Sequence, residues 1–131
     1  MSALRGLVEV VLTVADVERS LTFYRDVLRL ELISPPQVPA KFLRIGEPSD
    51  GIPKQIVLVP ASTQESEPKG RALHHIGLEV APADYQSEHD RINALGFDLR
   101  YGKHPFMPVD AFYLDDPDGN EIEIATWRGA S

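Results

Sequence analysis

Two carboxylates alternate with two isoleucines near the end of the chain, in the stretch DDPDGNEIEIATW at residues 115–127. The Asp, Pro and Gly residues at its start predict a turn, and the run that follows predicts a strand. Because side chains alternate along a strand, Glu121 and Glu123 share one face while Ile122 and Ile124 share the other. Carboxylates on a sheet face are either solvated or placed to bind a cation or move a proton. The stretch therefore indicates either a plain surface or a chemical site.

The elements that would position these carboxylates occur in one order that is used twice. Runs rich in β-branched residues predict strands, and apolar residues at helical spacing predict two helices. Asp16 is the expected N-cap of the first helix, Asp84 begins the second and Gly96 ends it. The predicted elements of the first half are a strand at 7–14, a helix at 17–28 and strands at 30–34, 41–45 and 54–60. Those of the second half are a strand at 74–80, a helix at 85–95 and strands at 97–101, 111–114 and 120–127.

Each half has the order βαβββ, and the two halves superimpose with an offset of 66 residues that places His75 over Glu9. The same offset pairs hydrophobic positions at both ends of the modules, which favours duplication over coincidence. These pairs are Leu78 with Leu12, Val80 with Val14, Ile122 with Ile56 and Ile124 with Leu58, while Glu123 falls on Val57. We predict one α+β domain, residues 1–131, of two tandem βαβββ modules forming a cupped mixed sheet. Module 1 spans about 7–60, a polar linker 61–71 and module 2 about 72–128.

Each predicted sheet has one apolar face under its helix and one mixed face. In the first strand Val8, Val10, Leu12 and Val14 point to the helix, and Glu9, Val11 and Thr13 point away. Two modules side by side would bring their mixed faces together into a cup. The expected lining of this cup is Glu9, Gln55, Val57, His75 and Glu123.

Composition excludes several classes of partner. Twenty acidic against thirteen basic residues give a net charge of -7, with the basic residues scattered, so nucleic acid and anionic membranes are poor partners. The chain has no cysteine, which excludes disulfides, thiolate metal sites and cysteine nucleophiles. The start, MSALRGLVEVVLTVAD, lacks the long apolar region of a signal peptide or membrane span. We therefore expect a cytoplasmic protein whose partner is a small molecule.

Three stretches in this order resemble the signatures of the vicinal oxygen chelate superfamily: VVLTVADVERSLTFYRDVLRLEL, HHIGLEV and YLDDPDGNEIEI. That group includes glyoxalase I, bleomycin-resistance proteins, fosfomycin-resistance enzymes, methylmalonyl-CoA epimerase and extradiol dioxygenases. The resemblance spans residues 7–127. It implies a glyoxalase-like fold of paired βαβββ modules, usually with a divalent metal at the base of the cup. The cup would form within one chain or across a swapped dimer, and we expect a homodimer.

Carried over by position, the resemblance implies a metal site at Glu9, His75 and Glu123. Members generally have His or Gln at the position of Glu9, so this residue is a departure, and the fourth ligand position falls on Val57 and is empty. Fosfomycin-type and dioxygenase-type members resemble this pattern in using three protein ligands. A second departure is Arg29, where the LGL of many members is LRL here.

Electrostatics supports a cation in such a cup. Glu9 and Glu123 facing one another would repel unless one is protonated, both are splayed into water, or a cation lies between them. One imidazole and two carboxylates suit Mn or Mg, with Zn and Ni also possible, whereas non-haem iron sites favour two His and one carboxylate. His74 is expected on the opposite face. His104, in the loop GKHPFMP, is either a surface residue or a pocket-lining second imidazole.

Two main hypotheses for function follow, with a third beside them. In the first, a metal-dependent lyase or isomerase acts on a small oxygen-chelating substrate, with His75 and Glu123 as ligands, Glu9 as ligand or base, and a cup carboxylate, Glu9 or Glu123, moving the proton. In the second, a metal-free module binds a drug or metabolite, in resemblance to the bleomycin-resistance proteins. The third is an extradiol-type dioxygenase with iron.

Overall fold

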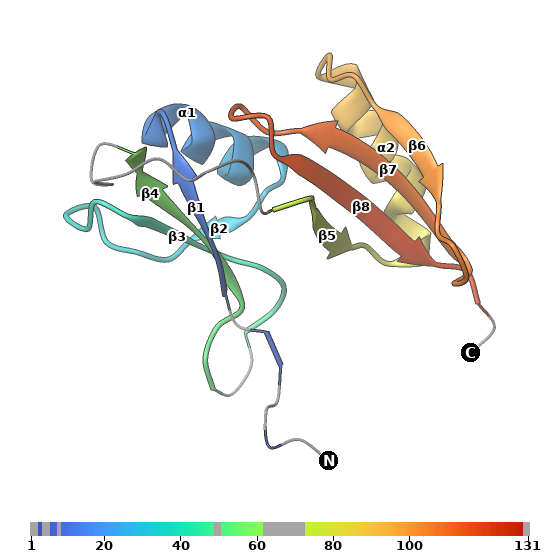
Figure 1. Cartoon of the computed structure of the whole chain (residues 1–131), viewed down its shortest axis with the longest axis horizontal. Helices are drawn as coiled ribbons and strands as arrows, with labels where there is room; N and C mark the ends of the chain where they lie inside the picture. Colours follow the sequence, from blue (N-terminus) through green and yellow to red (C-terminus); the bar gives the residue numbers. More distant parts are fainter. Residues whose placement is uncertain (1–2, 4–5, 8, 49–50, 62–72, 130–131) are drawn as a thin grey trace. The chain divides into compact units, whose positions relative to one another are not determined.

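The computed structural model describes residues 3, 6–7, 9–48, 51–61 and 73–129 (Figure 1). The chain divides into two compact units, Met1–Glu67 and Pro68–Ser131, hereafter the first and second unit. The predicted linker at 61–71 lies outside the described residues except for Ala61, and Val8 also lies outside them. No helix in the described ranges is long and apolar enough to span a bilayer.

The first unit is a four-stranded mixed sheet with one helical segment. Its strands follow the order β1-β4-β3-β2, in which β1 and β4 are parallel and the other neighbours are antiparallel. The elements are β1 Glu9–Val14, α1 Val17–Thr22, the π-helix η1 Phe23–Val27, β2 Glu31–Leu32, β3 Lys41–Arg44 and β4 Gln55–Pro60.

The first helix begins as predicted and ends differently. The carboxylate of Asp16 accepts a hydrogen bond from the Arg19 N–H at 3.1 Å, which makes Asp16 the N-cap. From Phe23 onward the helix widens, and the Leu28 N–H donates to the Phe23 carbonyl at 3.1 Å, five residues back. The chain then leaves the helix through Arg29, which has a φ of 60°.

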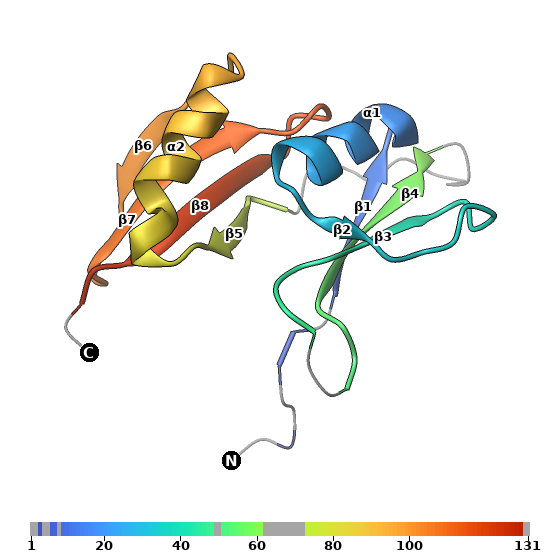
Figure 2. The ribbon, with the colours of Figure 1, turned by 180° about the vertical axis from the view of Figure 1, so that it is seen from behind.

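The second unit repeats this architecture. Its strand order is β5-β8-β7-β6, with β5 and β8 parallel and the remaining neighbours antiparallel. The helix α2 lies against one face of the sheet (Figure 2), where Tyr85 and His89 contact the ring of Phe112 with centroids 5.6 and 5.3 Å apart. The elements are β5 Ile76–Glu79, the 3-10 helix η3 Pro82–Asp84, α2 Tyr85–Ala94, β6 Arg100–Lys103, β7 Val109–Asp115 and β8 Glu121–Trp127.

The ends of α2 lie where the sequence predicts them. The helix follows Asp84, which forms no side-chain cap because a 3-10 turn precedes it, and Gly96 ends the helix with a φ of 95°.

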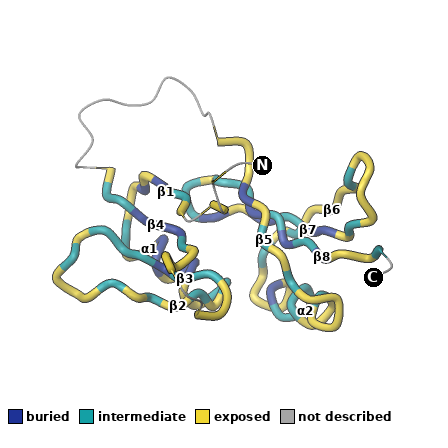
Figure 3. The backbone as a smooth tube through the Cα atoms, turned by 90° about the horizontal axis from the view of Figure 1, so that it is seen from below, coloured by how far each residue is buried: buried dark blue, intermediate teal, exposed yellow. Residues whose placement is uncertain are grey.

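The strand pairing confirms the repeat. Val10 pairs with Ile56 in the first unit and Ile76 pairs with Ile122 in the second, each 66 residues further along. Burial also alternates as predicted (Figure 3): in β8, Ile122 and Ile124 are buried, whereas Glu123 is only half-buried. The predicted α+β fold with two βαβββ modules is therefore confirmed. The cup that the two modules would form together stays a prediction.

Candidate metal centre

A tight turn sets the register that positions Glu123. The buried carboxylate of Asp116 accepts hydrogen bonds from the backbone N–H groups of Asp118 and Asn120, at 2.9 and 2.8 Å. It also accepts one from the Asn120 side-chain amide at 2.9 Å. This turn closes the β7–β8 hairpin so that Tyr113 lies directly opposite Glu123. On the other side of β8, the parallel strand β5 places Gly77 opposite the same residue.

Glu123 is held between a phenol and an imidazole. The Tyr113 hydroxyl donates a hydrogen bond to Glu123 Oε2 at 2.9 Å. The other oxygen, Oε1, lies 3.4 Å from His75 Nε2. The Glu123 side chain is 16% exposed and that of His75 is 37% exposed, so the imidazole and the carboxylate meet at the edge of the solvent. The structure thus brings together two of the three predicted site residues.

The surroundings of Tyr113 favour its protonated form. Burial raises the pKa of Tyr113 above its usual value, and the hydrogen bond to Glu123 and the negative charge of that carboxylate raise this pKa further. A phenol that stays neutral can continue to donate to Glu123. It fixes one carboxylate oxygen and leaves Oε1 directed towards His75.

Two glycines leave room for this arrangement. A Cβ added at Gly77 would lie 3.1 Å from Glu123 Oε1, which is closer than ordinary van der Waals contact. A Cβ added at Gly102 would lie 3.3 Å from Cε1 of the Tyr113 ring. The absence of side chains at these two positions therefore allows both Glu123 and Tyr113 to adopt their observed positions.

A second group of possible ligands lies beside the first. His74, His75 and Glu121 each offer a ligand atom, and these atoms lie within 4.8 Å of one another. The Nδ1 atoms of the two imidazoles are 2.7 Å apart. The expectation that His74 points to the opposite face is therefore wrong. Strand alternation does not apply to His74, because β5 begins only at Ile76.

Arg100 neutralises part of the negative charge at this end of the sheet. Its guanidinium donates to Asp115 at 2.6 Å and to Glu121 Oε2 at 3.0 Å. Glu121 therefore pairs with an arginine and also lies near the two histidines. Among the described residues Glu123 forms no ion pair with an arginine or a lysine, which makes it the more available carboxylate for a metal ion.

The remaining predicted positions belong to the first unit or have contacts of their own. Glu9 is an exposed residue of β1 and pairs with Gln55, and its approach to His75 and Glu123 stays a prediction. Val57 is 3% exposed. His104 has a local role: its Nδ1 accepts hydrogen bonds from the backbone N–H groups of Phe106 and Met107, at 3.2 and 2.9 Å.

Tyr113 and Gly77 were not identified from the sequence, although a signal for each was present. The turn centred on the DPDGN stretch places residue 113 opposite residue 123 in a hairpin. The 66-residue offset and the parallel pairing of the first and last strands of each module place Gly77 beside Glu123. An isolated glycine in a strand often marks the close approach of another group.

Comparison with known proteins agrees with this fold. A lactoylglutathione lyase from Agrobacterium tumefaciens superimposes with a TM-score of 0.70 at 21% identity, covering 95% of this chain and 96% of that chain. A glyoxalase/dioxygenase from Nostoc punctiforme superimposes with a TM-score of 0.72 at 19% identity, covering 97% and 94% respectively.

Sequence comparison identifies the family. An iron-dependent extradiol dioxygenase from Rhodococcus jostii is 27% identical over 129 residues, which are 92% of this chain and 42% of that relative. The chain thus spans less than half the length of this curated relative. The family model of the Glyoxalase/Bleomycin resistance protein/Dioxygenase superfamily matches residues 6–124. The chain belongs to this superfamily.

Proposed function

We propose that the protein is a metal-dependent lyase or isomerase that acts on a small substrate with two chelating oxygens. The observation that supports this most directly is the approach of His75 Nε2 to Glu123 Oε1 at 3.4 Å, with the other oxygen of Glu123 held by Tyr113. A neutral imidazole and a carboxylate that are side by side and partly exposed are suitable ligands for a divalent ion.

The donor set fits a divalent ion of the Mn, Mg, Zn, Ni or Fe group. His75 and Glu123 would hold the ion, and Glu9 is the proposed third ligand or the base. Such an ion, when bound, supplies Lewis-acid polarisation of the substrate oxygens. Tyr113 acts through Glu123, because its hydrogen bond restricts the rotation of the carboxylate and leaves one oxygen for the ion.

The residues of the chain have separate tasks in the reaction. His75 and Glu123 would hold the ion to which the substrate oxygens bind. Glu9, acting as the base, would take the proton from the carbon next to the substrate carbonyl and return it to a neighbouring atom. Removal of a general base of this kind typically lowers the rate by about 10²–10⁴-fold.

An iron-dependent dioxygenase is the second candidate, and two observations favour it. The Rhodococcus jostii relative is described as an iron-dependent extradiol dioxygenase. His74 lies beside His75, with ring nitrogens 2.7 Å apart, so a second imidazole is available in the second unit. Two imidazoles and one carboxylate are the ligand set that non-haem iron oxygenases favour.

Metal analysis of protein purified without chelator tests the main proposal. We expect about one divalent ion per chain, and a free ion concentration of 100 times Kd should stabilise the fold by about 2.7 kcal/mol. His75→Ala and Glu123→Ala should lose both the ion and this stabilisation. Glu47→Ala, which removes a carboxylate from an exposed loop, is the matched control and should retain both.

Three results distinguish the candidates. Stabilisation by Mn or Ni with isomerase or lyase turnover supports the main proposal. Oxygen-dependent ring opening of a catechol with Fe(II), lost in His74→Ala, would support the dioxygenase instead. Absence of bound metal, with an unchanged melting temperature on addition of Mn, Zn, Ni or Fe, would contradict both and leave a metal-free binding module.

A further inference from the structure

We propose that the sheet of the second unit carries a subsite for an apolar, ring-sized part of the substrate, next to Glu123, with Glu79 selecting a cationic or hydrogen-bond-donating substituent on that part. This inference rests on the proposed function, because it assumes that the polar head of the substrate lies at His75 and Glu123. It adds the chemical class of the remainder of the substrate.

The side chains on the mixed face of this sheet become smaller and then more apolar along β8. The register places Gly77, Glu123 and Tyr113 in one row across three strands. The next row, two residues further along β8, consists of Glu79, Ala125 and Ala111. The row after that pairs Trp127 with Val109. The row of Glu123 is thus followed by a floor of two alanines beside Glu79, and then by the larger apolar side chains of Trp127 and Val109.

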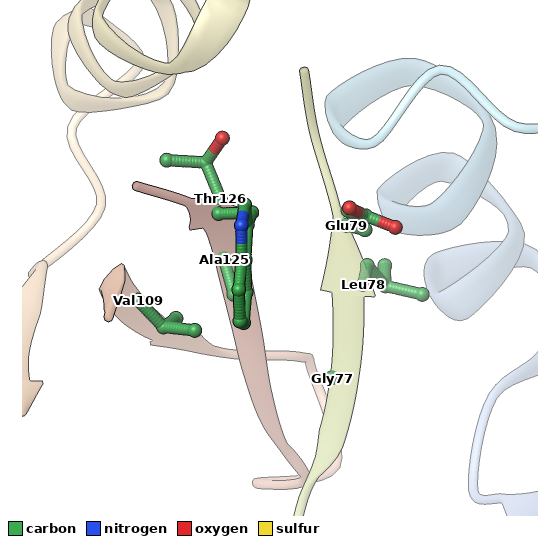
Figure 4. A pocket seen from close by; sticks show the side chains of 7 residues that line it. Gly77, Leu78, Glu79, Val109, Ala125 and Thr126 are labelled. Atoms are coloured by element: carbon green, nitrogen blue, oxygen red, sulfur yellow. The ribbon is translucent and has the colours of Figure 1, made fainter. Parts of the chain in front are cut away.

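A pocket of about 220 Å³ occupies this floor. Its lining includes Gly77 and Glu79 of β5, Ala125 and Trp127 of β8, and Val109 of β7. Figure 4 shows Gly77 and Glu79 along one strand, with Ala125 and Val109 on the neighbouring strands. Gly77 belongs to both sites. It lines the pocket, and a Cβ added to it would approach Glu123 Oε1. The pocket therefore borders the candidate metal centre at Gly77.

Size and polarity determine what this pocket can hold. An apolar cavity of about 150 Å³ is large enough for benzene, so the pocket accommodates one six-membered ring with a substituent. Glu123 and Trp127 are four residues apart on β8, roughly 13 Å at the strand rise of about 3.3 Å per residue. A substrate with a chelating head and one ring attached by a short link would span this distance.

Glu79 supplies the polar selectivity of the pocket. It is an exposed residue at the end of β5, and the structure shows no ion pair for it within the described part of the chain. A carboxylate beside an apolar ring favours an ammonium or N–H group on that ring over a second carboxylate.

Trp127 allows the subsite to be tested directly, because it is the single tryptophan of the chain. Benzylamine, which has the ring and the cation without a chelating head, should change the indole fluorescence of metal-free protein. Ala125→Leu should abolish this change by filling the floor, whereas Ala94→Leu on the exposed side of α2 is the matched control and should not. Glu79→Gln should weaken benzylamine binding by roughly two- to fivefold, as expected for an exposed ion pair, and leave benzyl alcohol binding unchanged.

The metal-loaded protein tests the link to the proposed function. Benzohydroxamate, which has a chelating head and a ring, should bind about tenfold more tightly than acetohydroxamate, which lacks the ring. Ala125→Leu should remove this difference without changing the affinity for acetohydroxamate. Unaltered indole fluorescence with benzylamine, or equal binding of the two hydroxamates, would overturn the subsite even if metal binding is normal. Loss of metal binding with a normal benzylamine response would overturn the proposed function and leave the pocket as a ring-binding site.

Discussion

Arg29 should be replaceable by glycine with a gain in stability. Among the described residues it is the only residue other than glycine with a positive φ, at 60°. A side chain in this left-handed conformation costs about 1–2 kcal/mol, whereas glycine adopts it without a steric penalty but loses roughly 0.5–1 kcal/mol more backbone entropy on folding. The difference predicts that Arg29→Gly raises the free energy of unfolding by about 0.5–1 kcal/mol.

Urea denaturation followed by far-ultraviolet circular dichroism measures this gain. With a slope of about 2 kcal/mol per molar urea, the midpoint should rise by roughly 0.25–0.5 M. Trp127 lies in the second unit, so its fluorescence provides a separate record of that unit in the same experiment.

Arg29→Ala separates backbone strain from loss of charge. Alanine removes the guanidinium but retains the Cβ that is strained at positive φ, so its effect should stay within about 0.5 kcal/mol. If Arg29→Ala stabilises the protein as much as Arg29→Gly, the charge and not the backbone is responsible and the argument is wrong.

Three further predictions concern the second unit. Gly77→Ala should weaken metal binding by about tenfold while keeping the fold, because the new Cβ would displace Glu123 Oε1; calorimetric titration with Mn checks this, and unchanged affinity would contradict it. The raised pKa of Tyr113 means that protonation of this phenol contributes stability that is present below pH 10 and lost as pH rises through the folded-state pKa. Phenolate absorbance should show a late step that Tyr113→Phe makes smaller and Glu123→Gln moves in part to lower pH; Tyr85, whose pKa burial also raises, accounts for the remainder. Asp116→Ala should lower the free energy of unfolding by about 2 kcal/mol, because two backbone N–H groups in the turn lose their acceptor, and thermal denaturation would show the turn to be dispensable if the melting temperature is unchanged.

The fold could be predicted from the sequence because the alternation of apolar and polar residues in a strand indicates which face is buried. Alternation in β8 places Ile122 and Ile124 under the helix, and burial of the wrong face would expose both. The 66-residue offset then extended this information to strand pairing, since Val10 opposite Ile56 and Ile76 opposite Ile122 follow from the same frame. The periodicity of each strand thus indicates which of its faces is buried, and the duplication indicates which strands pair.

Two predictions, for the first helix and for His74, differ from the structure because local hydrogen bonding departs from the repeating pattern. The sequence predicts a regular helix, but the helix continues as a π-helix at Phe23–Val27, in which Phe23 and Tyr24 are buried. The prediction for His74 is wrong because β5 begins only at Ile76, so strand alternation does not determine where residue 74 points. Both errors occur at the end of an element, where the backbone is no longer restricted by its repeating pattern.

The same frame shows why Glu123 has no carboxylate counterpart in the first module. At the position of Gly77, Glu123 and Tyr113, the first sheet has Val11, Val57 and Phe42.

These three differences depend on one another. Glu123 needs the space that Gly77 leaves, and its half-buried carboxylate needs the hydroxyl by which Tyr113 differs from a phenylalanine. A carboxylate at Val57, which is 3% exposed and lies opposite Phe42, would have neither a space nor a donor in its own row. Burial of that charge would cost several kcal/mol, so Val57→Glu should unfold the first unit rather than create a second site.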